Sequence, residues 1–296
     1  MSFDNLKPQT PRTRANSRDP AAAIAYAEEA LTRSRVAAAE CRTVFDLAYG
    51  GEDGQVLDLY LPHDEAAAGV PVLLWFHGGA WRHGYKEWNG FMAPSFVDLP
   101  AIFVSADYRL APEYRFPAQL DDAFTALAWV HREVGRHGGD PARISVGGWS
   151  AGGALAALLA LRRDLYTAHA LPDGVVKACH VSSASFEIRH NDTAPGNEGL
   201  NYADFFLGRP GDDRAASALH HVAGNRVPFF ISHGAQDFPH VMRTSGAMIA
   251  ALEREGCHVV HRVYDGLGHY ANNLSQGDPG SGWVPLVRDW LVSPPA

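Results

Sequence analysis

The sequence predicts an α/β protein built on one doubly wound, mostly parallel sheet of about eight strands with a small cap. Three features indicate this. Continuous apolar runs at 72–76 and 101–105 are typical of strands that are buried on both faces. Helical patterns, of which 118–137 is the longest, alternate with such runs along most of the chain. Near the middle, a strand at 143–146 meets an Ala/Leu helix at 154–161 across a glycine-rich turn.

The remaining elements follow in chain order. Residues 43–49 and 56–61 alternate apolar and polar side chains on either side of the glycine-rich stretch 50–54. This pattern predicts an antiparallel hairpin at the start of the sheet. Further strands are expected at 144–146, 175–181, 227–232 and 258–263, with further helices at 90–99 and 283–291.

A single domain is predicted over residues 20–296, preceded by a flexible tail at 1–19. Two segments do not fit the alternation of strand and helix. Residues 20–39 carry alanine, glutamate and arginine at helical spacing, and residues 187–219 are polar and rich in glycine and proline. Both segments are expected to be cap elements that cover part of the sheet's rim.

Composition narrows the classes of function. The formal charge of −8, from 25 basic and 33 acidic residues, argues against a surface for nucleic acid or anionic lipid. No apolar run is long enough to span a membrane, and residues 1–20 lack the apolar stretch of a signal peptide, so a cytoplasmic location is expected. Three scattered cysteines, and 15 histidines without metal-ligand spacing, predict no disulfide, no metal and no cofactor. The oligomeric state is left open, a homodimer included.

The glycine-rich turn is the strongest functional signal. A strand that meets a helix within two residues needs a tight turn, and the residue at its apex takes an unfavourable backbone conformation with an exposed side chain. Ser150 occupies that apex. Gly148 and Gly152, two positions away on either side, leave room for strand and helix to pass closely. A glycine-rich loop alone would explain the glycines but not the hydroxyl.

Partners for Ser150 are expected where other strands end, because working residues of an open parallel sheet lie at the carboxyl ends of its strands. The strand at 72–76 runs into Gly78 and Gly79, whose N–H groups could bind an oxyanion together with that of Ala151. The alternative is a plain turn. Two later strands lead to Asp237 and, in a short flexible loop, to His269.

Ser150, Asp237 and His269 occur in the chain order that this architecture imposes on a nucleophile, an acid and a base. His269 would accept the serine proton, while Asp237 would fix the tautomer of the imidazole. Glu187 is the alternative acid, since it follows the strand at 175–181, but Asp237 has the better local spacing. Arg109 is expected to pair with neighbouring carboxylates and order its loop rather than to bind substrate.

Five ordered motifs point to a known family. They are His-Gly-Gly-Ala-Trp at 77–81, Asp-Tyr-Arg-Leu-Ala-Pro-Glu-Tyr-Arg-Phe-Pro-Ala at 107–118, Gly-Trp-Ser-Ala-Gly-Gly at 148–153, His-Gly-Ala-Gln-Asp at 233–237 and Gly-His at 268–269. Over residues 40–292 the chain resembles the α/β-hydrolases, and within them it is similar to hormone-sensitive-lipase-like esterases and to the kynurenine-formamidase-like group. The resemblance implies the same triad and the same oxyanion donors. Ala80 in place of a third glycine, and Trp149 in place of an acidic residue, lean toward the formamidase-like group.

The predicted function is a serine hydrolase that cleaves carboxylic esters through an acyl-enzyme, acting on a small-molecule ester or amide. An arylformamidase or related amidase is the alternative, and a binding protein without chemistry is a third reading. Aromatic residues near the site predict an apolar pocket for a neutral ester or aryl amide. They are Trp81, Trp149, Phe186, Phe238 and Tyr270, with Tyr202, Phe205 and Phe206 from the cap segment.

Overall fold

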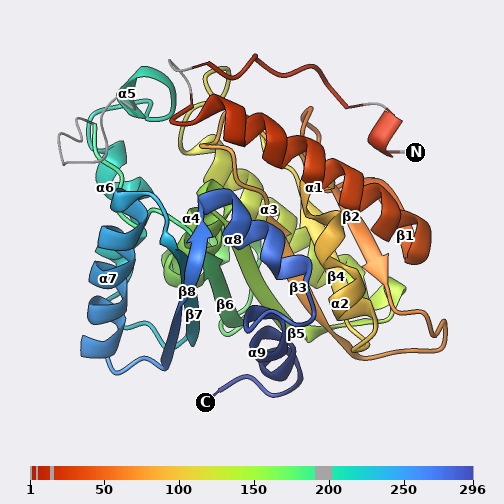
Figure 1. Ribbon diagram of the computed structural model, residues 1–296. Helices are drawn as coiled ribbons and strands as arrows, with labels where there is room; N and C mark the ends of the chain where they lie inside the picture. Colours follow the sequence, from red (N-terminus) through yellow and green to blue (C-terminus); the bar gives the residue numbers. More distant parts are fainter. Residues whose placement is uncertain (1, 5, 14–16, 191–201, 296) are drawn as a thin grey trace.

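Eight strands form one sheet in the computed structural model, which describes residues 2–4, 6–13, 17–190 and 202–295 (Figure 1). Their order across the sheet is β1-β2-β4-β3-β5-β6-β7-β8. The strands are β1 (Arg42–Ala48), β2 (Val56–Leu61), β3 (Val70–Phe76), β4 (Ile102–Ala106), β5 (Gly139–Trp149), β6 (Val176–Ser182), β7 (Phe229–Gln236) and β8 (Val259–Gly268).

The sheet is antiparallel at one edge and parallel elsewhere, as the sequence predicts. β2 pairs antiparallel with both β1 and β4, whereas every pair from β4 through β3 to β8 is parallel. The predicted hairpin and the predicted fold class are therefore confirmed. β7 and β8 extend beyond their apolar runs, because the backbone ladder continues through pairs such as Gly234 with Tyr264 and Gln236 with Gly268. Ladder bonds need no apolar side chain, so the apolar pattern predicted these strands too short.

Helices cover both faces of the sheet (Figure 1). On one face, α3, α4 and α7 pack on alternate residues of the central strands, among them Leu74 and Val146. On the other face, α1, α2 and α9 pack on the intervening residues, among them Leu73 and Trp75. The helices are α1 (Pro20–Glu40), α2 (Pro94–Val97), α3 (Ala118–Glu133), α4 (Ala151–Leu161), α5 (Tyr202–Phe205), α6 (Asp212–Ala216), α7 (Pro239–Arg254), α8 (His269–Leu274) and α9 (Trp283–Val292), with short 3-10 turns between them.

Helix α1 and the segment before it run side by side across the carboxyl ends of the strands (Figure 1). The Asp19 carboxylate accepts the Ala22 N–H and so begins the helix. The preceding segment is held by two hydrogen bonds between the Gln9 side chain and the backbone of Gly84, at 2.5 and 2.9 Å. The part of residues 1–19 that the structure describes thus makes specific contacts, while the predicted flexibility of this segment stays a prediction.

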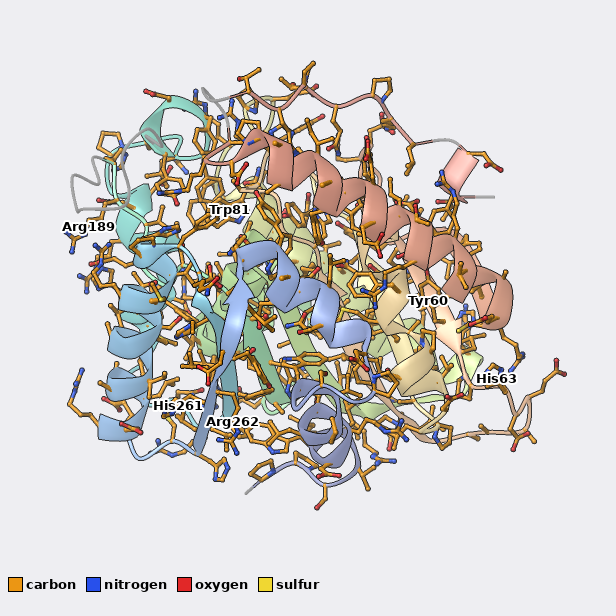
Figure 2. All side chains as sticks on the ribbon, in the orientation of Figure 1. Tyr60, His63, Trp81, Arg189, His261 and Arg262 are labelled. Carbon is orange, nitrogen blue, oxygen red and sulfur yellow. The ribbon has the colours of Figure 1, made fainter. Side chains whose placement is uncertain are left out.

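The second cap segment is described at residues 187–190 and 202–219, and residues 191–201 of the predicted cap lie outside the described residues. Its helices α5 and α6 lie beside the strand ends, where the ring of Phe206 stacks on Trp81 at 4.0 Å between centroids. Figure 2 shows Trp81 inside the molecule and Arg189, His261 and Arg262 at its periphery.

The described residues bear on three further expectations. They contain no helix long and apolar enough to cross a bilayer. Their three cysteines are free thiols. Within the same residues, no group of three or more His, Cys, Asp or Glu side chains is arranged to hold a metal ion.

Candidate active site

Ser150 sits at the junction of β5 and α4 with φ of 55° and ψ of −119°, a conformation that non-glycine residues rarely adopt. The two flanking glycines make this turn sterically feasible. A Cβ on Gly148 would lie 2.3 Å from the carbonyl carbon of Gly152, and one on Gly152 would lie 2.1 Å from the oxygen of Phe76. Helix α4 can therefore start directly against β3 and β5 only with glycine at these positions.

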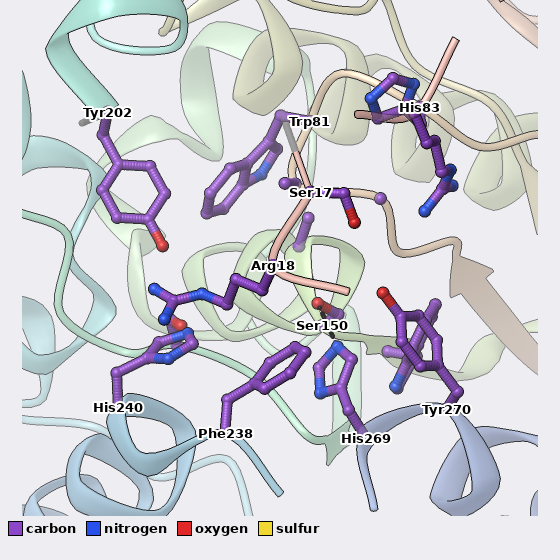
Figure 3. A pocket seen from close by; sticks show the side chains of 16 residues that line it. Ser17, Arg18, Trp81, His83, Ser150, Tyr202, Phe238, His240, His269 and Tyr270 are labelled. Atoms are coloured by element: carbon purple, nitrogen blue, oxygen red, sulfur yellow. Dashed lines mark hydrogen bonds between the residues drawn. The ribbon is translucent and has the colours of Figure 1, made fainter. Parts of the chain in front are cut away.

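His269 connects Ser150 to Asp237. Figure 3 shows His269 beside Ser150. Its Nε2 lies 3.0 Å from Ser150 Oγ, and its Nδ1 lies 2.7 Å from Asp237 Oδ1. Asp237 follows the last residue of β7. His269 is the first residue of α8, because β8 continues to Gly268. The prediction of a short flexible loop around His269 is therefore wrong, because β8 leads directly into α8. The His269 side chain nevertheless lies at the rim of the sheet, as expected.

Asp237 is held on both carboxylate oxygens. Ser183 Oγ donates to Oδ2 at 2.5 Å, and the Phe238 N–H donates to Oδ1 at 2.7 Å. Burial by itself would raise the pKa of this carboxyl, but the charge and hydrogen bond of His269, with those two donors, hold it below its usual value. Asp237 is therefore ionised at neutral pH and able to orient the imidazole.

Glu187, the alternative acid, is engaged elsewhere. Its Oε1 accepts a hydrogen bond from Arg189 at 2.8 Å. The acid that contacts His269 Nδ1 is Asp237.

The His77–Trp81 loop follows β3 and borders Ser150. Gly79 has φ of +120°, and a Cβ there would lie 2.0 Å from the carbonyl oxygen of His83. A Cβ on Gly78 would lie 2.3 Å from the Trp149 ring. Gly79 and Ala151 line the cavity beside Ser150, whereas Gly78 is not among the lining residues and lies against the Trp149 ring. Oxyanion binding by these three N–H groups stays a prediction.

Residues 107–109 brace this loop from behind. Tyr108 stacks on the His77 ring at 4.3 Å, and its hydroxyl donates to the His77 carbonyl at 2.9 Å. Arg109 makes a bidentate pair with Asp122, with its Nη2 at 2.6 Å and its Nε at 2.9 Å from the two carboxylate oxygens. The expectation that Arg109 orders its loop through a carboxylate is thus confirmed.

The sequence matches the family described as alpha/beta hydrolase fold over residues 73–272, a range that holds every residue of the Ser150–His269–Asp237 chain. The chain belongs to the α/β-hydrolase fold family. That part of the predicted resemblance is confirmed.

Curated relatives of this chain are esterases by name. It is 32% identical over 201 residues to Esterase LipC of Mycobacterium tuberculosis, covering 64% of this chain and 50% of that protein. It is 31% identical over 257 residues to Esterase LipQ of the same organism, covering 83% of this chain and 61% of that protein. The chain thus spans about half to three fifths of the length of these relatives. The resemblance to the kynurenine-formamidase-like group stays a prediction.

Solved structures share the fold of this chain. A Pyrobaculum calidifontis esterase superposes with a TM-score of 0.76 at 22% identity, covering 97% of this chain and 99% of that one. The carboxylesterase EstE1 from a metagenomic library gives a TM-score of 0.69 at 24% identity, covering 91% and 95% of the two chains.

The cavity beside Ser150 has a volume of about 70 Å³, and Figure 3 shows the side chains around it. Four of the five predicted pocket aromatics line it, namely Trp81, Trp149, Phe238 and Tyr270. Phe186 does not, because it is fully buried in the core on the α4 face of the sheet. From the predicted cap segment, Tyr202 lines the cavity, while Phe205 and Phe206 pack in the core.

Sequence reasoning missed six polar residues that also line the cavity: Arg12, Ser17, Arg18, His83, Ser185 and His240. Three of them come from the segment before α1, where no local pattern signals that the chain returns to the strand ends. Burial lowers the pKa of His83 to about 4 and that of His240 to about 3, with neighbouring arginines adding to the effect. Both imidazoles are therefore neutral at neutral pH.

Proposed function

We propose that this chain is a serine hydrolase that cleaves carboxylic esters through an acyl-enzyme intermediate. The observation that carries the proposal is the unbroken hydrogen-bond chain from Ser150 through His269 to Asp237, with separations of 3.0 and 2.7 Å. These are the separations that proton transfer between a nucleophile, a base and an orienting acid requires. The names of the curated relatives, which are esterases, support the ester as the bond that is cleaved.

The first half of the reaction forms the acyl-enzyme. Ser150 Oγ attacks the ester carbonyl, and His269 Nε2 takes the hydroxyl proton as the new C–O bond forms. Asp237 stabilises the imidazolium and keeps Nδ1 protonated. When the tetrahedral intermediate collapses, the bond to the alcohol breaks and His269 returns the proton to the leaving oxygen.

The second half releases the acid. A water molecule gives its proton to His269 Nε2 and attacks the acyl carbon. The bond to Ser150 Oγ then breaks, and the serine oxygen recovers its proton from His269. In both halves, negative charge develops on the former carbonyl oxygen, where the N–H groups of Gly78, Gly79 and Ala151 act as donors.

The size of the cavity indicates the substrate. A volume of about 70 Å³ beside Ser150 holds a group of a few heavy atoms. We therefore infer a preference for short acyl groups, and rates on p-nitrophenyl esters should fall as the acyl chain lengthens from acetyl to octanoyl.

Labelling and turnover test the proposal together. A fluorophosphonate should modify wild-type protein at Ser150, and Ser150→Ala should lose labelling and at least about 10⁴-fold in kcat on p-nitrophenyl acetate. If the wild type hydrolyses no short ester and Ser150 stays unmodified, the proposal is wrong.

Two carboxylate variants test which acid orients His269. Asp237→Asn should lower kcat by about 10³- to 10⁴-fold, since the amide favours the wrong tautomer, whereas Glu187→Gln should stay near wild type. The reverse result would assign the role to Glu187.

A further inference from the structure

Arg12 brings a guanidinium group to the cavity that holds Ser150 and His269. Its plane lies over the Trp88 ring, with the Cζ atom 5.0 Å from the ring centroid. Its Nη2 is shielded from solvent and donates to no acceptor in the described part of the chain. This nitrogen is thus a charged donor without an acceptor among the described residues, on a side chain that lines the same cavity as the nucleophile.

In the part of the chain that the structure describes, no carboxylate balances this charge. Besides burial, which lowers the pKa of Arg12, the groups that act on its charge are the hydroxyls of Tyr270, Tyr26 and Tyr85. Among the described residues, none of the aspartates or glutamates lies within ion-pair distance of Arg12 or lines the cavity. A partly desolvated cation without a counter-ion costs free energy, which an anion in the cavity would recover.

The other ionisable groups of the cavity do not change this balance. His83 and His240 are neutral at neutral pH, so they can hydrogen bond but carry no charge. Arg18 is a second guanidinium, over the Phe238 ring at 5.6 Å. The lining therefore combines cationic side chains, neutral imidazoles and aromatic rings around Ser150.

We propose that Arg12 is a specificity-determining residue that binds a carboxylate group on the substrate, so that the preferred substrates are small esters bearing a negative charge. A guanidinium presents its N–H groups as a planar fork that suits a carboxylate. The small cavity keeps the charged group within a few atoms of the ester bond. This inference rests on the proposed function, because it assigns the substrate class of the same site.

Either half of an ester can carry the carboxylate, and two matched pairs of substrates distinguish the halves. Monomethyl glutarate against dimethyl glutarate places the charge on the acid half. 4-Acetoxybutanoate against pentyl acetate places it on the alcohol half. In one of the pairs, wild-type kcat/KM should favour the charged ester by at least about 10-fold, the usual effect of a charge-assisted hydrogen bond.

Arg12→Met should abolish that preference, because methionine offers no charged donor to the carboxylate. Arg12→Lys, which keeps the charge without the fork, should retain part of the preference. Arg35→Met is the matched control: Arg35 lies on α1, is exposed, and covers the Phe3 ring at 5.8 Å. This variant removes the same charge outside the cavity, so the preference for the charged ester should not change. Each preference is a ratio within one preparation, so differences in folded protein cancel.

A second readout needs no turnover. Glutarate should slow fluorophosphonate labelling of Ser150 in the wild type and in Arg35→Met, but not in Arg12→Met. The inference is overturned if neutral and charged esters react alike, or if Arg12→Met keeps the wild-type preference and the protection by glutarate. In those cases neutral-ester turnover and labelling of Ser150 would still uphold the proposed function, whose own failure would show as a loss of both.

Discussion

Two cations near the Ser150 cavity differ in their surroundings. Lys86 is fully buried, and its Nζ lies 2.9 Å from Asp46, 3.0 Å from Asp58 and 2.6 Å from Glu87. Arg12 is half-buried and lies over an aromatic ring without a carboxylate in the described residues. Lys86 therefore has its counter-ions within the fold, whereas we propose that the counter-ion of Arg12 comes from a ligand.

The cluster of Lys86 with Asp46, Asp58 and Glu87 shows how strongly burial shifts the pKa of a charged group in this protein. Burial raises the pKa of Asp58 to about 7, even though Lys86 opposes the shift. Where the fold buries a charge for structural reasons, it therefore surrounds that charge with opposite ones. The segment from Gly79 to Lys86 borders both the Ser150 cavity and a second cavity beside Lys86, so the two arrangements occur within a few residues.

Removing the structural cation should have the largest effect on stability. Lys86→Met leaves Asp58 and Glu87 buried without their cation, and the free energy of unfolding should fall by about 3 to 5 kcal/mol. Urea denaturation at pH 7 measures this change. Arg12→Met in the same assay should cost no more than about 1 kcal/mol, because no buried carboxylate loses a partner. Equal losses in the two variants would erase the distinction between the two cations.

His180 shows a third arrangement, an ionisable group that is buried in its neutral form. Burial lowers its pKa from 6.5 to about 3. The folded state then binds fewer protons than the unfolded state below pH 6.5, so stability is lost as the pH falls toward 3. Between pH 7 and 4.5, the shifted pKa of His180 lowers the free energy of unfolding by about 2 to 3 kcal/mol.

The variant His180→Phe isolates the contribution of His180 to this pH dependence. It keeps an aromatic ring beside Phe230 and Trp290. Its unfolding free energy should fall by about 2 to 3 kcal/mol less than that of wild type between pH 7 and 4.5. Parallel pH curves for the two proteins would mean that His180 is charged in the folded state.

The smallest expected effect concerns the anchor of Arg12. Gln9 makes paired hydrogen bonds with Gly84, so Gln9→Ala should loosen the segment without touching the cavity. The cost in stability should be about 1 kcal/mol. The preference for a charged ester should fall by about 2- to 5-fold, since Arg12 would be less firmly placed. An unchanged preference would show that Arg12 is positioned by the Trp88 ring alone.

The sheet and the rim residues could be predicted because their signals are local. Apolar runs mark the parallel strands, and the steric needs of the turn fix Gly148 and Gly152 around Ser150. Asp237 and His269 could be found because strand ends meet at one edge of a parallel sheet. The extent of β8 could not, since backbone pairing continues beyond the apolar residues.

The residues that cover the cavity could not be predicted in the same way. Arg12 and Ser17 reach the cavity through contacts that span many residues, such as that between Gln9 and Gly84. Their surrounding sequence is polar and interrupted by prolines, a pattern shared with segments that make no contacts at all. Phe186 illustrates the converse, because an aromatic residue after a strand can turn inward as easily as toward the rim.

Helix α1 has a practical consequence for anyone who shortens this protein. Its Tyr26 hydroxyl donates to Asn273 at 2.7 Å and its Arg33 donates to the carbonyl of Leu274 at 2.9 Å, both on the helix that begins with His269. A truncation at residue 41 would spare all eight strands but remove both of these hydrogen bonds. Active-site titration would then find few competent molecules, because the imidazole would have lost its brace.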